Sequence, residues 1–204
     1  MKLYNELAWV WNALTPIDAY KEEAERLQSI AVEVSGRSIT SVLELGCGGG
    51  YLASHLSPSI EVVLVDNSSV MLAESIKRNP NHKHILGDMI SVDCQQKFDL
   101  IIVHDAIMYV PNRVDMLRLL QNICRHMHTE TVVCILPDVL KDNFSERVLQ
   151  AVGQDEDRCV VLSEWHWDPD LSDDSISVEF SLLIREDGIV STTHESHIMT
   201  VLSV

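Results

Sequence analysis

Short runs of aliphatic and β-branched residues alternate with longer amphipathic stretches over residues 1–155. Five runs predict β-strands: SVLEL at 41–45, EVVLV at 61–65, HIL at 84–86, FDLIIV at 98–103 and TVVCIL at 131–136. Five amphipathic stretches predict helices, at residues 17–34, 49–56, 68–78, 112–128 and 143–152. Strands that alternate with crossover helices form a parallel sheet with helices on both faces. The pattern therefore predicts an α/β fold with a doubly wound, mainly parallel sheet.

The pattern changes near residue 158, where three strand-like runs follow one another without a helical stretch between them. They are VVLSEWHW at 160–167, ISVEFSLLIR at 176–185 and IVSTTHESHIMTV at 189–201. Apolar and polar residues alternate in the second run, which is typical of a strand with one buried face. We expect an antiparallel β-meander here, and hence two domains. Residues 1–155 would form a ligand-binding α/β domain that begins with a helical segment, and residues 156–204 the meander.

Charge and composition narrow the class of partner. The 204 residues include 31 acidic and 15 basic ones, which gives a formal net charge of −16. Such a surface repels phosphate backbones and anionic membranes, so we expect neither a nucleic-acid nor a membrane partner. The first residues do not resemble a signal peptide, and no apolar run in the sequence has membrane-spanning length. Five scattered cysteines without a C-x-x-C pair favour reduced thiols and a cytoplasmic location.

The segment VLELGCGGG, residues 42–50, leads from a predicted strand directly into a glycine-rich turn. Gly46, Gly48 and Gly50 leave the backbone open to a ligand. The turn differs from a dinucleotide fingerprint because Tyr51 stands where the third glycine belongs. It also differs from a phosphate-binding P-loop, because no Gly-Lys-Ser/Thr follows.

Glu44 stands at the end of the predicted strand, next to the expected ligand. Its carboxylate would repel a pyrophosphate by Coulomb's law and attract an ammonium group. The spacing Glu44-x-Gly46-x-Gly48-x-Gly50 thus favours a cationic amino-acid ligand without phosphates. At this point the sequence resembles the class I S-adenosylmethionine-dependent methyltransferases, whose first motif is an acidic residue followed by G-x-G-x-G.

The resemblance covers residues 40–138 and implies a Rossmann-like fold with S-adenosylmethionine as the cofactor. Asp66, which ends the second predicted strand in VVLVDNSSVMLAES, matches the acidic residue that binds both ribose hydroxyls. LGDM and FDLIIVHDAIMYV match the later motifs, whose residues lie at the carboxyl ends of their strands. The cofactor-binding residues that the resemblance implies are Glu44, Gly46, Cys47, Gly48, Gly50, Asp66, Asn67, Met71, Asp88, Met89, Val103, His104 and Tyr20.

The chemistry of methyl transfer asks little of the protein's side chains. The reaction is an in-line displacement at a methyl group that the sulfonium already activates, so alignment of the reactants supplies most of the catalysis. A general base helps when the acceptor arrives as an alcohol or an ammonium. His104 and Asp105 are the nearest candidates and form the expected catalytic pair. Alternative roles stay open for both: His104 would satisfy a backbone group, and Asp105 would cap a helix or order the loop.

Two further segments resemble small-molecule methyltransferases that include amino-sugar N-methyltransferases. YNELAWVW and AYKEEAERL, within residues 4–29, correspond to a segment that often lies over the cofactor and lines the acceptor pocket. The resemblance also implies that the meander helps to form the acceptor site or a homodimer, with Trp165, His166 and Trp167 as candidate pocket walls. The alternative is that the first segment packs on the sheet and the tryptophans pack in the core.

We expect no metal site, although two patterns suggest one at first sight. Cys124, His126 and His128 do not share one face of the predicted helix. The acidic stretch DPDLSDDSISVE has the carboxylate spacing of a calcium loop but lacks its glycine. An acidic turn explains that stretch better.

We therefore predict a methyltransferase that methylates a nitrogen or oxygen atom of a small molecule and yields S-adenosylhomocysteine. The alternative is a non-catalytic subunit or sensor that keeps the cofactor-binding fold. A nicotinamide-dependent oxidoreductase is disfavoured by Glu44 and Tyr51. The family normally ends with a further helix and an antiparallel strand pair, for which the 204 residues leave no room. Either the protein is a truncated or reduced methyltransferase, or the meander replaces that pair, or another chain covers the open sheet edge.

Overall fold

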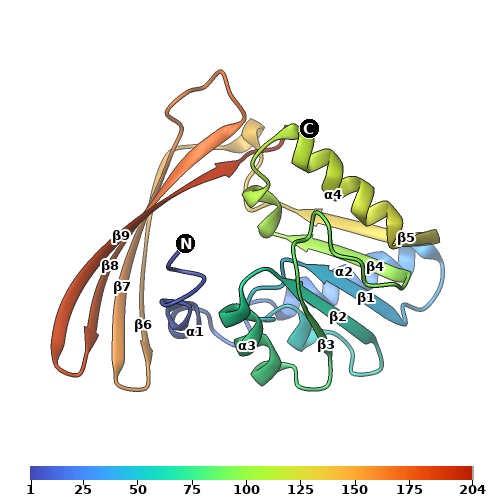
Figure 1. Cartoon of the computed structure of the whole chain (residues 1–204), viewed down its shortest axis with the longest axis horizontal. Coiled ribbons are helices and arrows are strands. Elements are labelled where there is room, and N and C mark those ends of the chain that lie inside the picture. Colours follow the sequence, from blue (N-terminus) through green and yellow to red (C-terminus); the bar gives the residue numbers. More distant parts are fainter. Residues whose placement is uncertain (204) are drawn as a thin grey trace. The chain divides into compact units, whose positions relative to one another are not determined.

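The computed structural model describes residues 1–203 (Figure 1). They form two compact units, each with its own sheet. The parallel unit comprises Ile17–Leu136, and the antiparallel unit comprises Met1–Pro16 together with the chain from Pro137 onward. The chain thus leaves the antiparallel unit, forms the parallel unit and returns. The second crossing falls at residues 136/137, earlier than the boundary at 155/156 that the sequence pattern suggests.

Five parallel strands form the sheet of the parallel unit, in the order β3-β2-β1-β4-β5. Their bounds are β1 (Ser41–Leu45), β2 (Glu61–Asp66), β3 (Lys83–Leu86), β4 (Phe98–His104) and β5 (Met127–Leu136). Each strand lies on one of the predicted apolar runs. The three central strands, β2, β1 and β4, are almost wholly buried, as the continuous apolar runs require. The Rossmann-like fold is therefore confirmed.

Three helices of the parallel unit match predicted ones: α2 (Lys21–Ser35), α3 (Ser69–Arg78) and α4 (Arg113–Arg125). Ser68 caps α3 by accepting a hydrogen bond from the backbone amide of Met71. The prediction of a helix at 49–56 is wrong, because Gly48 and Gly50 have positive φ angles and leave only the short 3-10 helix η1 (Ala53–His55). A second 3-10 helix, η2 (Ala106–Tyr109), follows β4. Within residues 1–203, no helix is both long and apolar enough to cross a membrane.

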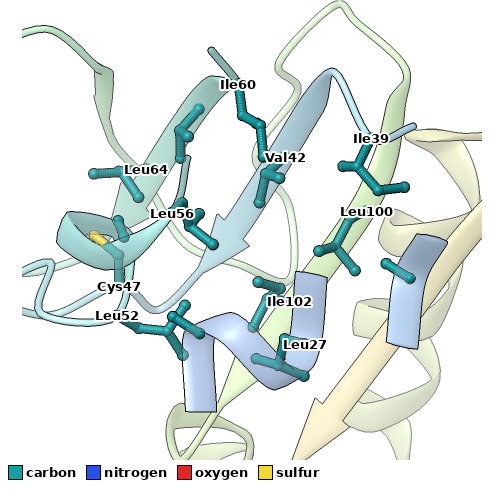
Figure 2. Close-up of a cluster of buried hydrophobic side chains, with 14 of the residues drawn as sticks. Leu27, Ile39, Val42, Cys47, Leu52, Leu56, Ile60, Leu64, Leu100 and Ile102 are labelled. Carbon is teal, nitrogen blue, oxygen red and sulfur yellow. The ribbon is translucent and has the colours of Figure 1, made fainter. Parts of the chain in front are cut away.

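The main hydrophobic core of the parallel unit lies between α2, η1 and one face of the sheet, as Figure 2 shows. Alternate residues of β1, β2 and β4 point into it, which is the period expected of strands. The side chains labelled in the figure are Leu27, Ile39, Val42, Cys47, Leu52, Leu56, Ile60, Leu64, Leu100 and Ile102. This core holds the carboxyl ends of β1, β2 and β4 at fixed positions along one sheet edge.

The antiparallel unit contains a four-stranded sheet in the order β6-β7-β8-β9. The bounds are β6 (Arg147–Asp155), β7 (Arg158–Trp167), β8 (Ser175–Glu186) and β9 (Ile189–Thr200), preceded by α1 (Trp9–Leu14) and η3 (Lys141–Asn143). The meander is confirmed, but it has one strand more than expected. The prediction of a helix at 143–152 is wrong, because residues 147–152 belong to β6 and pair with β7, which follows a tight corner in which Glu156 has a φ of 51°.

The N-terminal residues close the antiparallel unit. The backbone amides of Lys2 and Leu3 donate to the Glu195 carboxylate at 2.8 and 3.0 Å. Helix α1 packs on β6 at Gly153, where a Cβ would lie 2.3 Å from the Ala13 carbonyl oxygen. The segment 4–29 is therefore divided between the units: its first part packs against the meander, and only residues from Ile17 onward belong to the parallel unit.

Candidate functional site

The glycine-rich turn after β1 is held by backbone hydrogen bonds to β2. The amides of Gly46 and Cys47 both donate to the Val65 carbonyl oxygen, at 2.8 and 2.9 Å. Gly46, Gly48 and Gly50 have φ angles of 76°, 52° and 70°, which side-chain-bearing residues rarely adopt. This path of the backbone therefore requires glycine at every second position of the motif.

Close neighbours add a second reason for two of these glycines. A Cβ on Gly46 would lie 2.3 Å from the Ala106 Cβ, and one on Gly50 would lie 2.3 Å from the Ser75 Oγ of α3. The role that a dinucleotide fingerprint gives to its third glycine, close packing of a helix, is therefore filled by Gly50. Tyr51 stays compatible with the turn for this reason.

Helix α3 fastens the far side of the turn through residues that the sequence analysis missed. The Arg78 guanidinium lies over the Tyr51 ring, 3.7 Å from its centroid, and donates to the Gly49 carbonyl oxygen. The Asn79 side chain donates to the Gly50 carbonyl oxygen at 2.8 Å. Nothing in the local sequence marks Arg78 or Asn79 for this task, because the contacts span 29 residues.

Three predicted site residues meet at the carboxyl edge of the sheet: Glu44 on β1, Asp66 on β2 and His104 on β4. Their strands are neighbours, since β1 pairs with both β2 and β4. The strand order reverses at β1, and ligands of open α/β sheets bind at such a switch point. The topology therefore brings these groups to one place along the edge.

Asp66 orders the backbone around itself. Its Oδ2 accepts a hydrogen bond from the Gly48 amide and its Oδ1 one from the Ser68 amide, both at 2.8 Å. Burial raises its pKa, while the bonds from Ser68 and Gly48 act in the opposite direction. The backbone amide of Asn67 also acts on the carboxylate, and because a carboxylate has about four acceptor positions, these three amides do not use all of them.

Glu44 is the least satisfied charged group of the site. Its side chain is buried, and within residues 1–203 its Oε2 has no hydrogen-bond partner. Its pKa is raised to about 8, chiefly because burial disfavours the carboxylate, although the charge of His104 acts in the opposite direction. A buried carboxylate oxygen of this kind fits the ammonium of an amino-acid ligand, as the motif predicts.

His104 lies between two carboxylates. Its Nδ1 is 3.1 Å from the Asp105 Oδ2, and its Nε2 is 3.1 Å from the Glu23 Oε1 on α2. The Tyr20 ring meets the imidazole edge-on, with the centroids 5.5 Å apart. Burial lowers the pKa of His104, but Asp105, Glu23 and Glu44 raise it more, to about 9. The sequence analysis missed Glu23, because its contact with His104 spans 81 residues of sequence.

The other predicted residues fall into three groups. Met71 and Met89 lie beside the turn, because a Cβ on Gly48 would be 3.5 Å from the Met71 Cε and one on Gly46 would be 4.0 Å from the Met89 Sδ. The side chains of Cys47 and Val103 are buried, and Cys47 packs in the core of Figure 2. Asn67 and Asp88 are exposed, and Asp88 accepts a hydrogen bond from the Ile90 amide.

The candidate acceptor residues of the meander do not share one face. Trp165 and Trp167 lie on the same side of β7, with ring centroids 6.3 Å apart. His166 points to the opposite side, where it is buried and contacts Glu164. The three side chains therefore cannot form one wall of a pocket together. Among residues 1–203, no three His, Cys, Asp or Glu side chains are grouped so as to hold a metal ion.

Comparison with known proteins identifies relatives of the chain. The family model described as a methyltransferase domain matches residues 37–168. Nodulation protein S of Azorhizobium caulinodans is 27% identical over 124 residues, which are 59% of this chain and 58% of the relative. Trans-aconitate 2-methyltransferase of Variovorax paradoxus is 34% identical over 98 residues, which are 46% of this chain and 38% of the relative. The chain thus spans about half the length of the curated relatives that it matches.

Solved structures share the fold. DesVI of Streptomyces venezuelae matches with a TM-score of 0.81 and 18% identity, over 97% of this chain and 82% of that one. The sugar N-methyltransferase KedS8 of a Streptoalloteichus species matches with a TM-score of 0.80 and 21% identity, over 90% and 74%. CalS10 of Micromonospora echinaspora, an amino pentose methyltransferase with bound S-adenosylmethionine, matches with a TM-score of 0.78 and 17% identity, over 97% and 82%. That bound molecule agrees with the cofactor expected from the motifs.

Proposed function

Because the chain belongs to the methyltransferase domain family, we propose that it transfers a methyl group from S-adenosylmethionine to a nitrogen or oxygen atom of a small molecule. The observation that carries the proposal is Glu44, whose buried Oε2 has no hydrogen-bond partner within residues 1–203. Burial of a carboxylate is costly unless a cation accompanies it. The ammonium of S-adenosylmethionine is such a cation, and S-adenosylmethionine has no phosphate groups that Glu44 would repel.

The residues of the turn and of the sheet edge divide the binding task between them. When bound, S-adenosylmethionine supplies a methyl group that its sulfonium activates. In the proposed arrangement Glu44 holds the ammonium, and Asp66 accepts hydrogen bonds from the ribose hydroxyls with the acceptor capacity that the backbone amides leave free. Met71 and Met89 border the adenine, with Asn67 and Asp88 at its exposed rim.

The two members of the expected catalytic pair receive different roles. Both ring nitrogens of His104 contact carboxylate oxygens, which favours the protonated ring and opposes a role as general base. Asp105 is then the member that accepts a proton from an alcohol or an ammonium acceptor. Its backbone is held in place by a hydrogen bond from its amide to the Leu136 carbonyl oxygen at 2.8 Å.

We propose a sugar-derived amine as the first acceptor to test, because two of the structural neighbours are a sugar N-methyltransferase and an amino pentose methyltransferase. The antiparallel unit is proposed to contribute either acceptor contacts or a homodimer interface. A cytoplasmic location is supported by five cysteines that are all free thiols.

Calorimetry on the full chain tests cofactor binding. We expect saturable binding of both S-adenosylmethionine and S-adenosylhomocysteine, and a weakening of at least about tenfold in Asp66→Asn, which keeps one acceptor but loses the charge. The matched control is Asp93→Asn, because Asp93 is an exposed carboxylate that also accepts a backbone amide, from Gln95 at 2.8 Å. No binding by the purified chain, or equal binding in Asp66→Asn, would sink the proposal.

A second assay separates the enzyme from a non-catalytic subunit or sensor. Transfer of a labelled methyl group to amino-sugar or hydroxy-acid acceptors is the outcome expected of the enzyme. Tight binding of both cofactor forms with no transfer to any acceptor would favour the binding subunit, and it would leave the assignment of Glu44 and Asp66 intact.

A further inference from the structure

We propose that Glu23 is a positioning residue of the methyltransferase site, which with Asp105 holds His104 as a doubly protonated ring facing Glu44. The inference rests on the proposed function for its consequence but not for its geometry. Glu23 lies on α2, well before the motifs that define the cofactor site, and its contact with His104 spans 81 residues of sequence.

When both neighbouring carboxylates are ionised, the geometry determines how many protons the ring carries. A neutral imidazole has one donor nitrogen and one acceptor nitrogen, whereas an ionised carboxylate only accepts. Each nitrogen of His104 lies 3.1 Å from a carboxylate oxygen, that of Asp105 on one side and that of Glu23 on the other. Two good hydrogen bonds therefore require two N–H groups, and the ring carries a positive charge. The raised pKa of His104, about 9, agrees with this reading.

The consequence of the charge lies at Glu44. The groups that act on the Glu44 carboxylate are His104 on β4, Asp66 on β2 and Glu23 on α2, and only His104 is a cation. Of these three charges, that of His104 has the largest effect on the pKa of Glu44 and that of Glu23 the smallest. Loss of the imidazolium charge would thus outweigh removal of the Glu23 charge itself, and Glu44 would hold its proton more firmly.

Glu23 thereby acts on the ligand through two other side chains. A protonated Glu44 offers an ammonium a neutral carboxyl group in place of a carboxylate, which is the weaker partner. Because Glu44 has a pKa of about 8, a modest change in the neighbouring charge changes its ionised fraction near neutral pH. We therefore expect Glu23 to control the affinity for the cofactor between pH 7 and 9.

The test compares Glu23→Gln with Glu22→Gln. Both remove one negative charge from the first turn of α2, but Glu22 is exposed and points about 100° away around the helix. Histidine-labelled protein is titrated by NMR between pH 5 and 10, and the signal of His104, one of nine histidines, is identified by its loss in His104→Gln. The affinity for S-adenosylhomocysteine is measured by calorimetry over the same pH range.

In the wild type we expect His104 to stay protonated up to about pH 9. In Glu23→Gln its pKa should fall by about two pH units, so that most of the ring charge is lost at pH 8, and the affinity at that pH should weaken severalfold. In Glu22→Gln the affinity should change by less than about twofold, and the pKa of His104 by no more than a few tenths of a pH unit. The affinity difference between wild type and Glu23→Gln should narrow below pH 6, where the ring is protonated in both.

Three results would overturn the inference: an unchanged titration of His104 in Glu23→Gln, equal effects of the two variants, or an affinity loss that does not depend on pH. Each of these leaves the proposed function standing, because the wild type still binds. Conversely, a wild type that binds neither S-adenosylmethionine nor S-adenosylhomocysteine refutes the proposed function. The titration of His104 would even then decide whether Glu23 holds its second proton.

Discussion

At the scale of single residues, two buried carboxylates of the same sheet behave in opposite ways. Asp99, near the start of β4, accepts hydrogen bonds from the amides of Thr40 and Ser41 at 2.7 and 3.0 Å and also contacts Arg37 and His128. Burial raises its pKa, but these hydrogen bonds hold it well below its usual range. Glu44, at the other end of the sheet, has a raised pKa. The first carboxylate stabilises the fold, and the second is costly to the fold and useful to a ligand.

Glu44→Gln should therefore stabilise the ligand-free protein and weaken cofactor binding. The folded pKa of Glu44, about 8, exceeds the ordinary value of 4.5, so the wild type loses stability as pH rises from 4.5 through 8. The variant lacks this loss, which is on the order of 3 kcal/mol at pH 7 before the cost of burying the amide is subtracted. Thermal unfolding of both proteins at pH 5 and pH 8 measures it. We expect the variant to gain several degrees relative to the wild type at pH 8 and little at pH 5; a constant difference would contradict the assignment.

At the scale of elements, the turn after β1 shows how a short segment can be fixed by its neighbours. Gly46, Gly48 and Gly50 all have positive φ, but their surroundings differ from those of other such glycines. A Cβ on Gly50 would meet Ser75 and Asn79 of the α3 region at 2.3 and 2.4 Å, whereas one on Gly36, which follows α2, would have nothing within 4 Å. Gly36 and Gly50 have similar φ angles. Comparing substitutions at the two positions therefore separates the cost of the left-handed conformation from the cost of a steric clash.

Gly50→Ala and Gly36→Ala make that separation measurable. Gly36→Ala should lower the free energy of unfolding by about 1 kcal/mol, the cost of the left-handed conformation alone. Gly50→Ala should lower it by about 2 kcal/mol more, because α3 must shift to make room. It should also weaken binding of S-adenosylhomocysteine, which Gly36→Ala should not. Urea unfolding and calorimetry supply the two readouts, and equal destabilisation by the two variants would show that the turn has more room than its contacts indicate.

Local sequence predicts the elements that local chemistry determines. The apolar runs of β1, β2 and β4 require burial on both faces, and the glycines of the turn require their φ angles, so both are visible in the sequence. Strand β6 is not, because its residues suit a helix equally well and become a strand only by pairing with β7. Glu23 is missed for a related reason: its partner His104 is 81 residues away, and no local pattern encodes the contact.

At the scale of the whole molecule, the net charge opposes self-association, whereas exposed apolar side chains favour it. The chain carries a net charge of −16, which repels a second copy at low salt. One face of the antiparallel sheet nevertheless presents exposed apolar side chains: Val148, Val152, Trp165, Leu183 and Ile198. An apolar patch shared by neighbouring strands suits the homodimer interface that we propose for this sheet.

Self-association through this face should increase with salt, which screens the charge and leaves apolar contacts intact. We expect sedimentation velocity to show more dimer at about 0.5 M than at about 0.05 M salt. Trp165→Glu should abolish the dimer, whereas Leu117→Glu, at an exposed position on α4, should leave it unchanged. A monomer at all salt concentrations, or an equal response to both variants, would rule out this interface.

The pairing of the N-terminal amides with Glu195 has a consequence for the order of events on the ribosome. The carboxylate that the amide of Leu3 binds is synthesised 192 residues after Leu3 itself. The parallel unit, Ile17–Leu136, is complete in the nascent chain long before then. We therefore expect the parallel unit to fold during translation, before Glu195 is available to the amides of Lys2 and Leu3.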